Sequence, residues 1–198
     1  MTAPQRREVI ERVATEVFAE RGYAGAAMDE IARRSGVSAP VVYDHFASKQ
    51  DLYERLLERT RDELLEVWRD HLFTDEPAAV RIPRAIEAWA AYVETHPYAS
   101  RMYFRDATGV PAVQELHREI HAQGRAVLGT ILGRERGAAN IAGADDREAL
   151  EMAAEVMRAG LAGLAVWWSE RPHVPRERIV TVAVNVLWVG FERISAGR

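Results

Sequence analysis

Cysteine is absent from this sequence. A chain without cysteine has no disulfide framework, no thiol nucleophile and no cysteine-ligated metal site. The sequence also has no apolar run long enough to cross a membrane, and its first residues lack the apolar core of a signal peptide. Together these absences predict a cytoplasmic protein.

Enzyme motifs are missing as well. The sequence contains no glycine-rich phosphate loop and no nucleophile-elbow pattern. His117 and His121 are spaced to share one helix face, but Arg118 stands where the zinc-protease motif has glutamate. A third metal ligand would have to come from Asp106 or His96. We therefore predict no metal site, no cofactor and no enzymatic activity.

Positive charge is not in excess. The formal net charge is −4, which by itself argues against a nucleic-acid partner. The first fifty residues hold seven basic and seven acidic side chains, so this segment is neutral and the remainder carries the −4. The only lysine, Lys49, lies in this neutral segment. A neutral module with clustered arginines predicts modest non-specific DNA affinity, with specificity arising from positioned contacts.

Helical periodicity runs through almost the whole chain, and no alternating apolar-polar stretch is long enough for a strand. Glycine and proline separate the periodic segments. The glycine- and alanine-rich stretch 133–146 is predicted to be a mobile loop. The pattern predicts an all-α fold of about nine helices, at residues 5–21, 28–35, 39–45, 48–72, 82–95, 98–104, 111–135, 147–170 and 175–196.

Residues 28–57 are the most informative part of the chain. Two short helices flank Gly36, which permits a tight turn, and Ser38 is expected to cap the second of them. Val42 and Phe46 would dock this second helix on the first helix of the chain, which Gly22 ends. The pattern predicts a helix-turn-helix within an N-terminal domain, residues 1–47, followed by a second domain, residues 48–198.

The last two predicted helices are apolar around most of their circumference. Helices of this kind need burial on more than one side, and a second copy of the chain would supply it. The alternative is an ordinary hairpin within one chain. The predicted dimer interface consists of Val156, Gly160, Leu164, Trp167, Val182, Val186 and Val189.

Several motifs occur in a characteristic order before these helices. They are Arg21-Gly-Tyr23, Asp29-Glu-Ile-Ala32, Gly36-Val-Ser38, Val42-Tyr-Asp-His-Phe46 and Ser48-Lys49. In these motifs the sequence resembles the TetR family of bacterial transcriptional regulators. The resemblance implies a homodimer that binds a palindromic operator, most often as a repressor, and is released by a small molecule in a C-terminal pocket.

The resemblance also implies site residues. For DNA binding these are Arg33, Arg34, Ser38, Ala39, Pro40, Val41, Tyr43, His45 and Lys49. An apolar or aromatic effector would contact Trp89, Tyr92, Met102, Tyr103, Phe104, His117, Ile120, His121 and Trp168. Family members commonly carry Thr or Ser at the start of the second helix, where this chain has Ala26 and Ala27. The alternative function is that of an architectural or ligand-independent DNA-binding protein.

Overall fold

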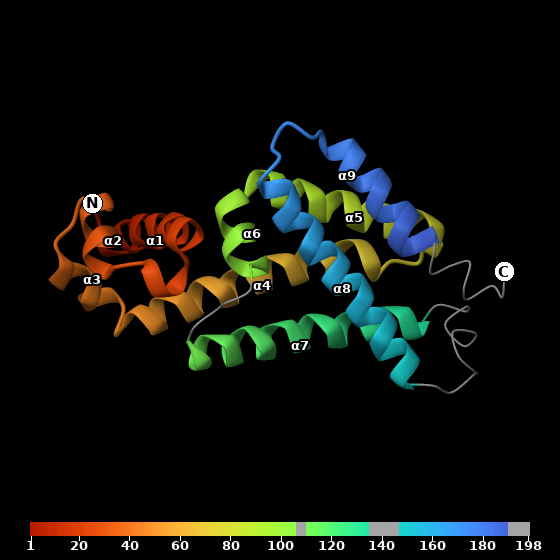
Figure 1. Cartoon of the computed structure of the whole chain (residues 1–198), viewed down its shortest axis with the longest axis horizontal. Coiled ribbons are helices and arrows are strands. Elements are labelled where there is room, and N and C mark those ends of the chain that lie inside the picture. The colour runs from red at the N-terminus through yellow and green to blue at the C-terminus, as the bar shows by residue number, and fades with distance from the viewer. Residues whose placement is uncertain (106–109, 135–146, 190–198) are drawn as a thin grey trace. The chain divides into compact units, whose positions relative to one another are not determined.

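A computed structural model describes residues 1–105, 110–134 and 147–189 (Figure 1). These residues form helices and connecting turns and contain no strand, which confirms the predicted all-α class. Most of the predicted loop, residues 135–146, and the end of the last predicted helix, 190–196, lie outside the described residues. The chain divides into two compact units, one of Met1–Asp62 with His96–Ile120 and one of Glu63–Thr95 with His121–Arg198.

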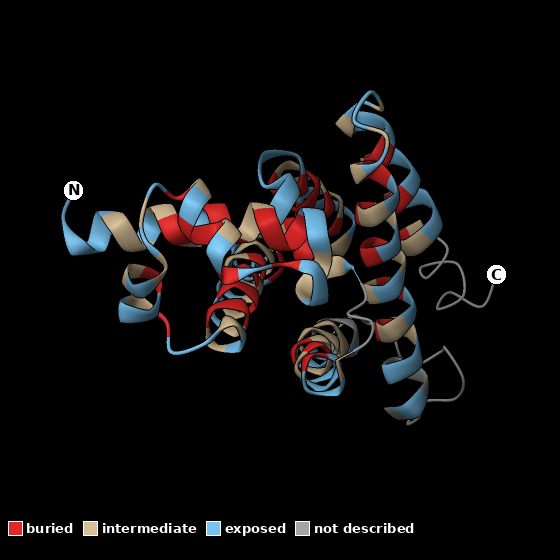
Figure 2. Ribbon diagram, turned by 60° about the vertical axis from the view of Figure 1, so that its left-hand side comes forward, coloured by how far each residue is buried: buried red, intermediate tan, exposed pale blue. Residues whose placement is uncertain are grey.

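The first unit is built from six helical segments. They are α1 (Ala3–Gly25), α2 (Met28–Arg34), α3 (Ala39–His45), the start of α4 (Lys49–Leu72), α6 (Pro97–Phe104) and the start of α7 (Pro111–Arg134). Helix α1 packs against both α2 and α6. Its apolar side contributes Ile10, Val13, Ala14, Val17 and Phe18 to the core, as the helical spacing predicts. Figure 2 shows helices with buried residues along one side and exposed residues along the other.

Helix α1 begins and ends at identifiable signals. Thr2 and Gln5 form a reciprocal capping box at its start. Gly22 interrupts the helix with φ 69° and ψ 170°, and one further turn follows to Gly25. The predicted glycine break is therefore present at Gly22. Its ψ lies outside the left-handed helical region, in a conformation that is almost confined to glycine.

The second unit contains the rest of α4 and α7 together with α5 (Ala78–Thr95), α8 (Arg147–Ser169), α9 (Arg176–Ala183) and a π-helical stretch, η2 (Val184–Val189). Helix α5 packs against both α9 and η2. Arg176 of α9 forms ion pairs of 2.9 Å with Glu87 and 2.6 Å with Glu94, both on α5. The structure describes no helix that is long and apolar enough to span a membrane.

Two of the predicted helices differ from the structure, one in where it begins and one in its helix type. Helix α5 begins at Ala78 rather than near residue 82, because the Pro77 carbonyl accepts from the amides of Val80 and Arg81 and starts the helix early. Pro83 then lies inside the helix, where it removes one backbone donor. The last predicted helix is not uniformly α-helical, since it widens to a π-helix at Val184.

Candidate functional site

The connection between α2 and α3 is a tight hydrogen-bonded turn. The amide of Gly36 donates to the Arg33 carbonyl at 3.2 Å, and the amide of Val37 donates to the Ala32 carbonyl at 3.0 Å. Gly36 has φ 71°, which side chains disfavour and glycine adopts freely. This pair of bonds is the Schellman arrangement that ends a helix at glycine. It fixes the direction in which the chain enters α3, as the sequence predicts.

Helix α3 is held by its buried side and exposes the other. Val42 and Phe46 are buried, whereas Ser38, Pro40 and Tyr43 are exposed and Ala39, Val41 and His45 are half-buried. Tyr43, at 52% exposed, is the most exposed large side chain of this helix. Of the six positions predicted to meet DNA at α3 and its N-cap, three are exposed and three are half-buried.

Ser38 differs in one respect from the prediction. It occupies the N-cap position of α3, but its hydroxyl makes no hydrogen bond to the helix backbone. Only the Ser38 carbonyl bonds to the helix backbone, where it accepts from the amide of Val41 at 3.1 Å. The prediction that the Ser38 side chain caps α3 is therefore wrong, and the hydroxyl remains available on the exposed surface. Ala27 likewise leaves the start of α2 without a side-chain cap, as its residue type requires.

The start of α4 is well ordered by side-chain hydrogen bonds. The amide of Asp51 donates to Ser48 Oγ at 3.0 Å, and Asp51 Oδ2 accepts from the amide of Ala47 at 3.0 Å. This resembles a capping box in which the reciprocal bond is displaced by one residue. Lys49 follows Ser48 directly and so begins the helix where the backbone amides favour an anion.

Lys49 is held against the turn that follows Gly22. Its ammonium donates to the carbonyl of Ala24 at 3.4 Å and lies 4.6 Å from the centre of the Tyr23 ring. Burial lowers the pKa of the Lys49 side chain. A phosphate oxygen at this position would compensate for the water that the ammonium has lost.

The two arginines of α2 differ in their surroundings. Arg34 is bound by three carboxylates, at 3.1 Å from Glu16, 2.8 Å from Glu20 and 3.9 Å from Glu30, which ties α2 to α1. The hydrogen bond from Arg34 lowers the pKa of Glu20. Arg33 is exposed and forms no ion pair within the described ranges. Arg33 is therefore available as a cation at the surface, whereas Arg34 already has its partners.

Three members of the predicted effector set, His117, Tyr92 and Trp168, have hydrogen-bond partners within the chain. In the first unit, Tyr53 Oη and His117 Nε2 form a buried hydrogen bond of 3.0 Å. In the second unit, Tyr92 donates to Glu63 at 2.7 Å, and Trp168 Nε1 donates to the Val174 carbonyl at 2.8 Å. These aromatic groups therefore do not offer an unpaired polar atom to a ligand.

Burial of the predicted effector set is high in both units. Met102, Tyr103, His117 and Ile120 are buried in the first unit, where Phe104 is half-buried. Trp89, Tyr92 and Trp168 are buried in the second unit, where His121 is half-buried. Tyr53 is absent from the predicted set, because nothing in its local pattern points to a partner 64 residues further along the chain.

Large apolar side chains are exposed on α8, α9 and η2 in the second unit. They are Met152, Val156, Trp167, Val182 and Val186, and we call this set the α8/η2 apolar surface. Three of the predicted dimer residues, Gly160, Leu164 and Val189, are half-buried. A Cβ at Gly160 would lie 2.9 Å from Leu187 Cδ2 of the same chain, so this glycine allows close intrachain packing. A Cβ at Gly163 would meet nothing.

Among the residues with described positions, no group of three or more His, Asp or Glu side chains could hold a metal ion. Asp106, one of the two conceivable third ligands for a histidine pair, lies outside the described residues.

Comparison with known proteins agrees with this arrangement. Residues 10–56 match the family described as bacterial regulatory proteins, tetR family. The HTH-type transcriptional activator FasR of Mycolicibacterium smegmatis is 41% identical over 102 residues, which cover 52% of this chain and 47% of that protein. The chain thus spans about half the length of this relative. The HTH-type transcriptional repressor BepR of Brucella suis is 32% identical over 80 residues, covering 40% and 38% of the two chains.

The likeness extends over the whole fold in solved structures. A TetR-like transcriptional regulator from Rhodococcus sp. RHA1 superposes with a TM-score of 0.76 at 17% identity, covering 94% of this chain and 96% of that one. At this identity the likeness concerns the fold alone. The family match, residues 10–56, covers most of α1 together with α2, α3 and the start of α4.

Proposed function

The chain belongs to the TetR family of bacterial transcriptional regulators, and we propose that it acts as a homodimer that binds a palindromic operator and responds to a small effector. The transcription-regulator class and DNA binding follow from the family. The observation that carries the finer proposal is the exposed side of α3, adjoined in sequence by Lys49 at the start of α4.

Base contacts are proposed for the first half of α3. Ser38, Ala39, Pro40 and Val41 would enter the major groove, as the start of a recognition helix does in dimeric helix-turn-helix proteins. None of these side chains can make a bidentate bond to guanine. Base selection would come from apolar contact with thymine methyl groups, from the Ser38 hydroxyl and from DNA shape.

Phosphate contacts are proposed for the residues that surround this helix. Tyr43 and His45 would donate to phosphate oxygens, and Lys49 would place its ammonium and the amides of the α4 start against another phosphate. Arg33 supplies a further exposed cation on α2. Arg34 is not assigned a phosphate contact here, because its three carboxylate partners would have to be given up first.

Dimerisation is proposed for the α8/η2 apolar surface. Large apolar side chains that are exposed close together often mark a surface that another protein covers. The surface presents Val156 at 64% exposed and Val186 at 67%, with Trp167 at 43%. An isologous contact between two such surfaces would pair two DNA-reading units, which a palindromic operator requires.

Effector binding is proposed for buried residues of the predicted set, either Met102 and Tyr103 in the first unit or Trp89, Tyr92 and Trp168 in the second. Since Tyr92 and Trp168 already have intrachain hydrogen-bond partners, an effector that contacts them would be mainly apolar. Such effects on DNA binding amount to a coupling free energy of about 1–3 kcal/mol. We propose release from DNA on effector binding, as in a repressor. The direction is a prediction, since one relative is named an activator and another a repressor.

Operator selection from a random duplex library, followed by fluorescence anisotropy at several salt concentrations, tests the DNA-binding proposal. Tyr43→Phe with Lys49→Ala should weaken binding and make the plot of log K against log salt shallower by about one unit for each lysine lost. Tyr98→Phe with Arg118→Ala is a matched control, since these exposed side chains lie on α6 and α7 of the same unit. Equal losses in both variants would contradict the assigned phosphate contacts.

The alternative function gives a different result in the same experiment. An architectural or ligand-independent DNA-binding protein would bind selected and scrambled duplexes with similar affinity, and no small molecule would release it. A regulator binds the selected duplex in preference, with two protomers at each site. A reporter gene placed behind the selected operator then decides between repression and activation.

A further inference from the structure

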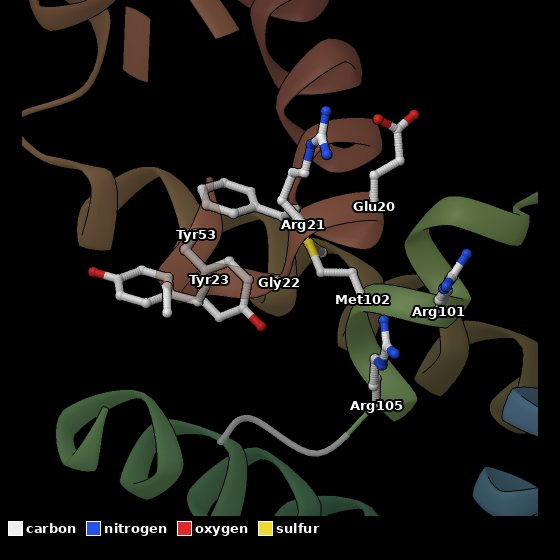
Figure 3. Close-up of a pocket in the computed structure, with 10 residues that line it drawn as sticks. Glu20, Arg21, Gly22, Tyr23, Tyr53, Arg101, Met102 and Arg105 are labelled. Carbon is white, nitrogen blue, oxygen red and sulfur yellow. The ribbon is translucent and has the colours of Figure 1, made fainter. Parts of the chain in front are cut away.

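A cavity of about 350 Å³ lies within the first unit, between the end of α1, the start of α4 and α6 (Figure 3). Its volume is at the lower end of the range found for small-molecule sites. No function considered so far uses it, and only Met102 belongs to the predicted effector set. The residues that line it are Phe18, Glu20, Arg21, Gly22, Tyr23, Ala24, Tyr53, Arg101, Met102 and Arg105.

Positive charge predominates around this cavity. Arg21, Arg101 and Arg105 face a single carboxylate, that of Glu20, which already pairs with Arg34 at 2.8 Å. Arg101 and Arg105 form no ion pair with any residue in the described ranges. The cavity therefore offers two guanidinium groups whose bidentate donors match a carboxylate or a similar anion.

The opposite side of the cavity is mainly apolar and aromatic. Tyr53 and Met102 are buried, and the Tyr53 ring packs edge-on against Phe18 at 4.8 Å and against Tyr23 at 5.0 Å between centroids. Figure 3 shows Tyr23 and Tyr53 on one side, Arg101 and Arg105 on the other, and Met102 between them. A ligand placed here would meet aromatic and thioether surface at one end and guanidinium groups at the other.

We propose that this cavity binds a small anionic amphipathic molecule. A carboxylate or equivalent anion would lie between Arg101 and Arg105, and a flat apolar body would lie against Met102 and the Tyr53 ring. The volume accommodates a body of one or two fused rings. This site shares only Met102 with the effector residues proposed above, and it differs from them in the arginines that line it.

The cavity is connected to a residue of the proposed DNA surface. Tyr23 and Ala24 line it, and these are the residues that hold Lys49, through the Tyr23 ring at 4.6 Å and the Ala24 carbonyl at 3.4 Å. A ligand that displaces the Tyr23 ring would shift the Lys49 ammonium. Occupancy should therefore change operator affinity. This second part rests on the proposed DNA-binding function, whereas the binding of the anion does not.

Isothermal titration of the full-length protein with 2-naphthoate tests the site directly. We expect a dissociation constant of about 1 mM or below, the affinity that a ligand of this size reaches at ordinary efficiency. Arg101→Gln with Arg105→Gln should weaken binding by about tenfold or more, since charge-assisted hydrogen bonds are lost. Arg118→Gln is the matched control, an exposed arginine of the same unit that does not line the cavity.

Two comparison ligands separate the charge from the ring. The neutral 2-naphthamide should bind more weakly than 2-naphthoate, and acetate should not compete at equal concentration. Absence of naphthoate binding, equal binding by the Arg101/Arg105 variant, or competition by acetate would overturn the proposal. Circular dichroism of the variant should match the wild type, because both arginines lie at least partly in solvent.

The coupling to DNA has its own readout. Operator anisotropy with and without 2-naphthoate should show a change in affinity for the wild type and none for the Arg101/Arg105 variant. Naphthoate binding without any change in DNA affinity would refute the coupling and leave the site intact. A protein that binds naphthoate but no duplex at all would contradict the proposed function instead.

Discussion

Replacing Tyr53 by phenylalanine tests the buried contact between α4 and α7 in the first unit. The substitution removes one oxygen and keeps the ring, so the contacts with Phe18 at 4.8 Å and Tyr23 at 5.0 Å persist. It deletes the 3.0 Å hydrogen bond to His117, which is 5% exposed. The loss of a buried bond that leaves one partner behind costs about 1–3 kcal/mol. We therefore expect Tyr53→Phe to lower the free energy of unfolding by that amount.

Urea denaturation followed by circular dichroism measures this change. All variants should be compared at one protein concentration, because the proposed dimerisation would make apparent stability concentration-dependent. Tyr43→Phe is the matched control, since the same atom is removed from a side chain that is 52% exposed. A surface substitution of this kind should change the free energy of unfolding by no more than about 0.5 kcal/mol.

A double-mutant cycle assigns the energy to the pair. Tyr53→Phe and His117→Leu should each destabilise the protein, and the double variant should be more stable than the sum of the two losses predicts, because the second change removes the group left unpaired by the first. Tyr53→Phe with wild-type stability, or strict additivity in the cycle, would refute the hydrogen bond as a stabilising contact.

Other predictions concern pH and packing. Burial raises the pKa of Tyr53, so the stability it contributes is complete below the unfolded tyrosine pKa of about 10 and is lost as the pH rises beyond it; urea titrations should show a shallower alkaline loss for Tyr53→Phe. Gly160→Ala would place a Cβ 2.9 Å from a terminal methyl of Leu187 on η2, so this side chain must turn aside and most of the helix-propensity gain of about 1 kcal/mol should be lost. Gly163→Ala, which meets nothing, should be neutral or stabilising by up to about 1 kcal/mol; equal effects of the two changes would refute this packing. Val156→Arg with Val186→Arg should yield a monomer in sedimentation velocity with an unchanged circular dichroism spectrum. A dimer that persists in this variant would show that the interface lies elsewhere.

Local signals in the sequence determined much of the first unit. The bounds predicted for α3, residues 39–45, agree with the structure. The segment between Gly36 and Phe46 is too short to hold more than one short helix, so its bounds could be predicted closely. The end of α4 at Leu72 was likewise predictable from its apolar spacing. These features depend on residues a few positions apart, which periodicity and capping rules describe well.

Contacts between distant segments could not be read from periodicity. The three carboxylates around Arg34 come from two helices, and their distances depend on how those helices pack. The cavity near Arg101 and Arg105 depends in the same way on the contact between α1 and α6. The π-helical segment Val184–Val189 contains no proline or glycine, so the sequence gives no local signal for it. The motif that contains Tyr23 was recognised, but the role of Tyr23 in holding Lys49 was not.

The single lysine makes this protein unusually simple to label. Amine-reactive reagents find one ε-amino group in 198 residues, and a lowered pKa increases the share of Lys49 that is nucleophilic at a given pH. Acylation at Lys49 can therefore be followed by mass spectrometry as one peptide, with no competing thiol in the chain. Slower acylation of Lys49 in the presence of duplex, or faster acylation in the presence of a bound anion, would report changes at this one amine without an engineered label.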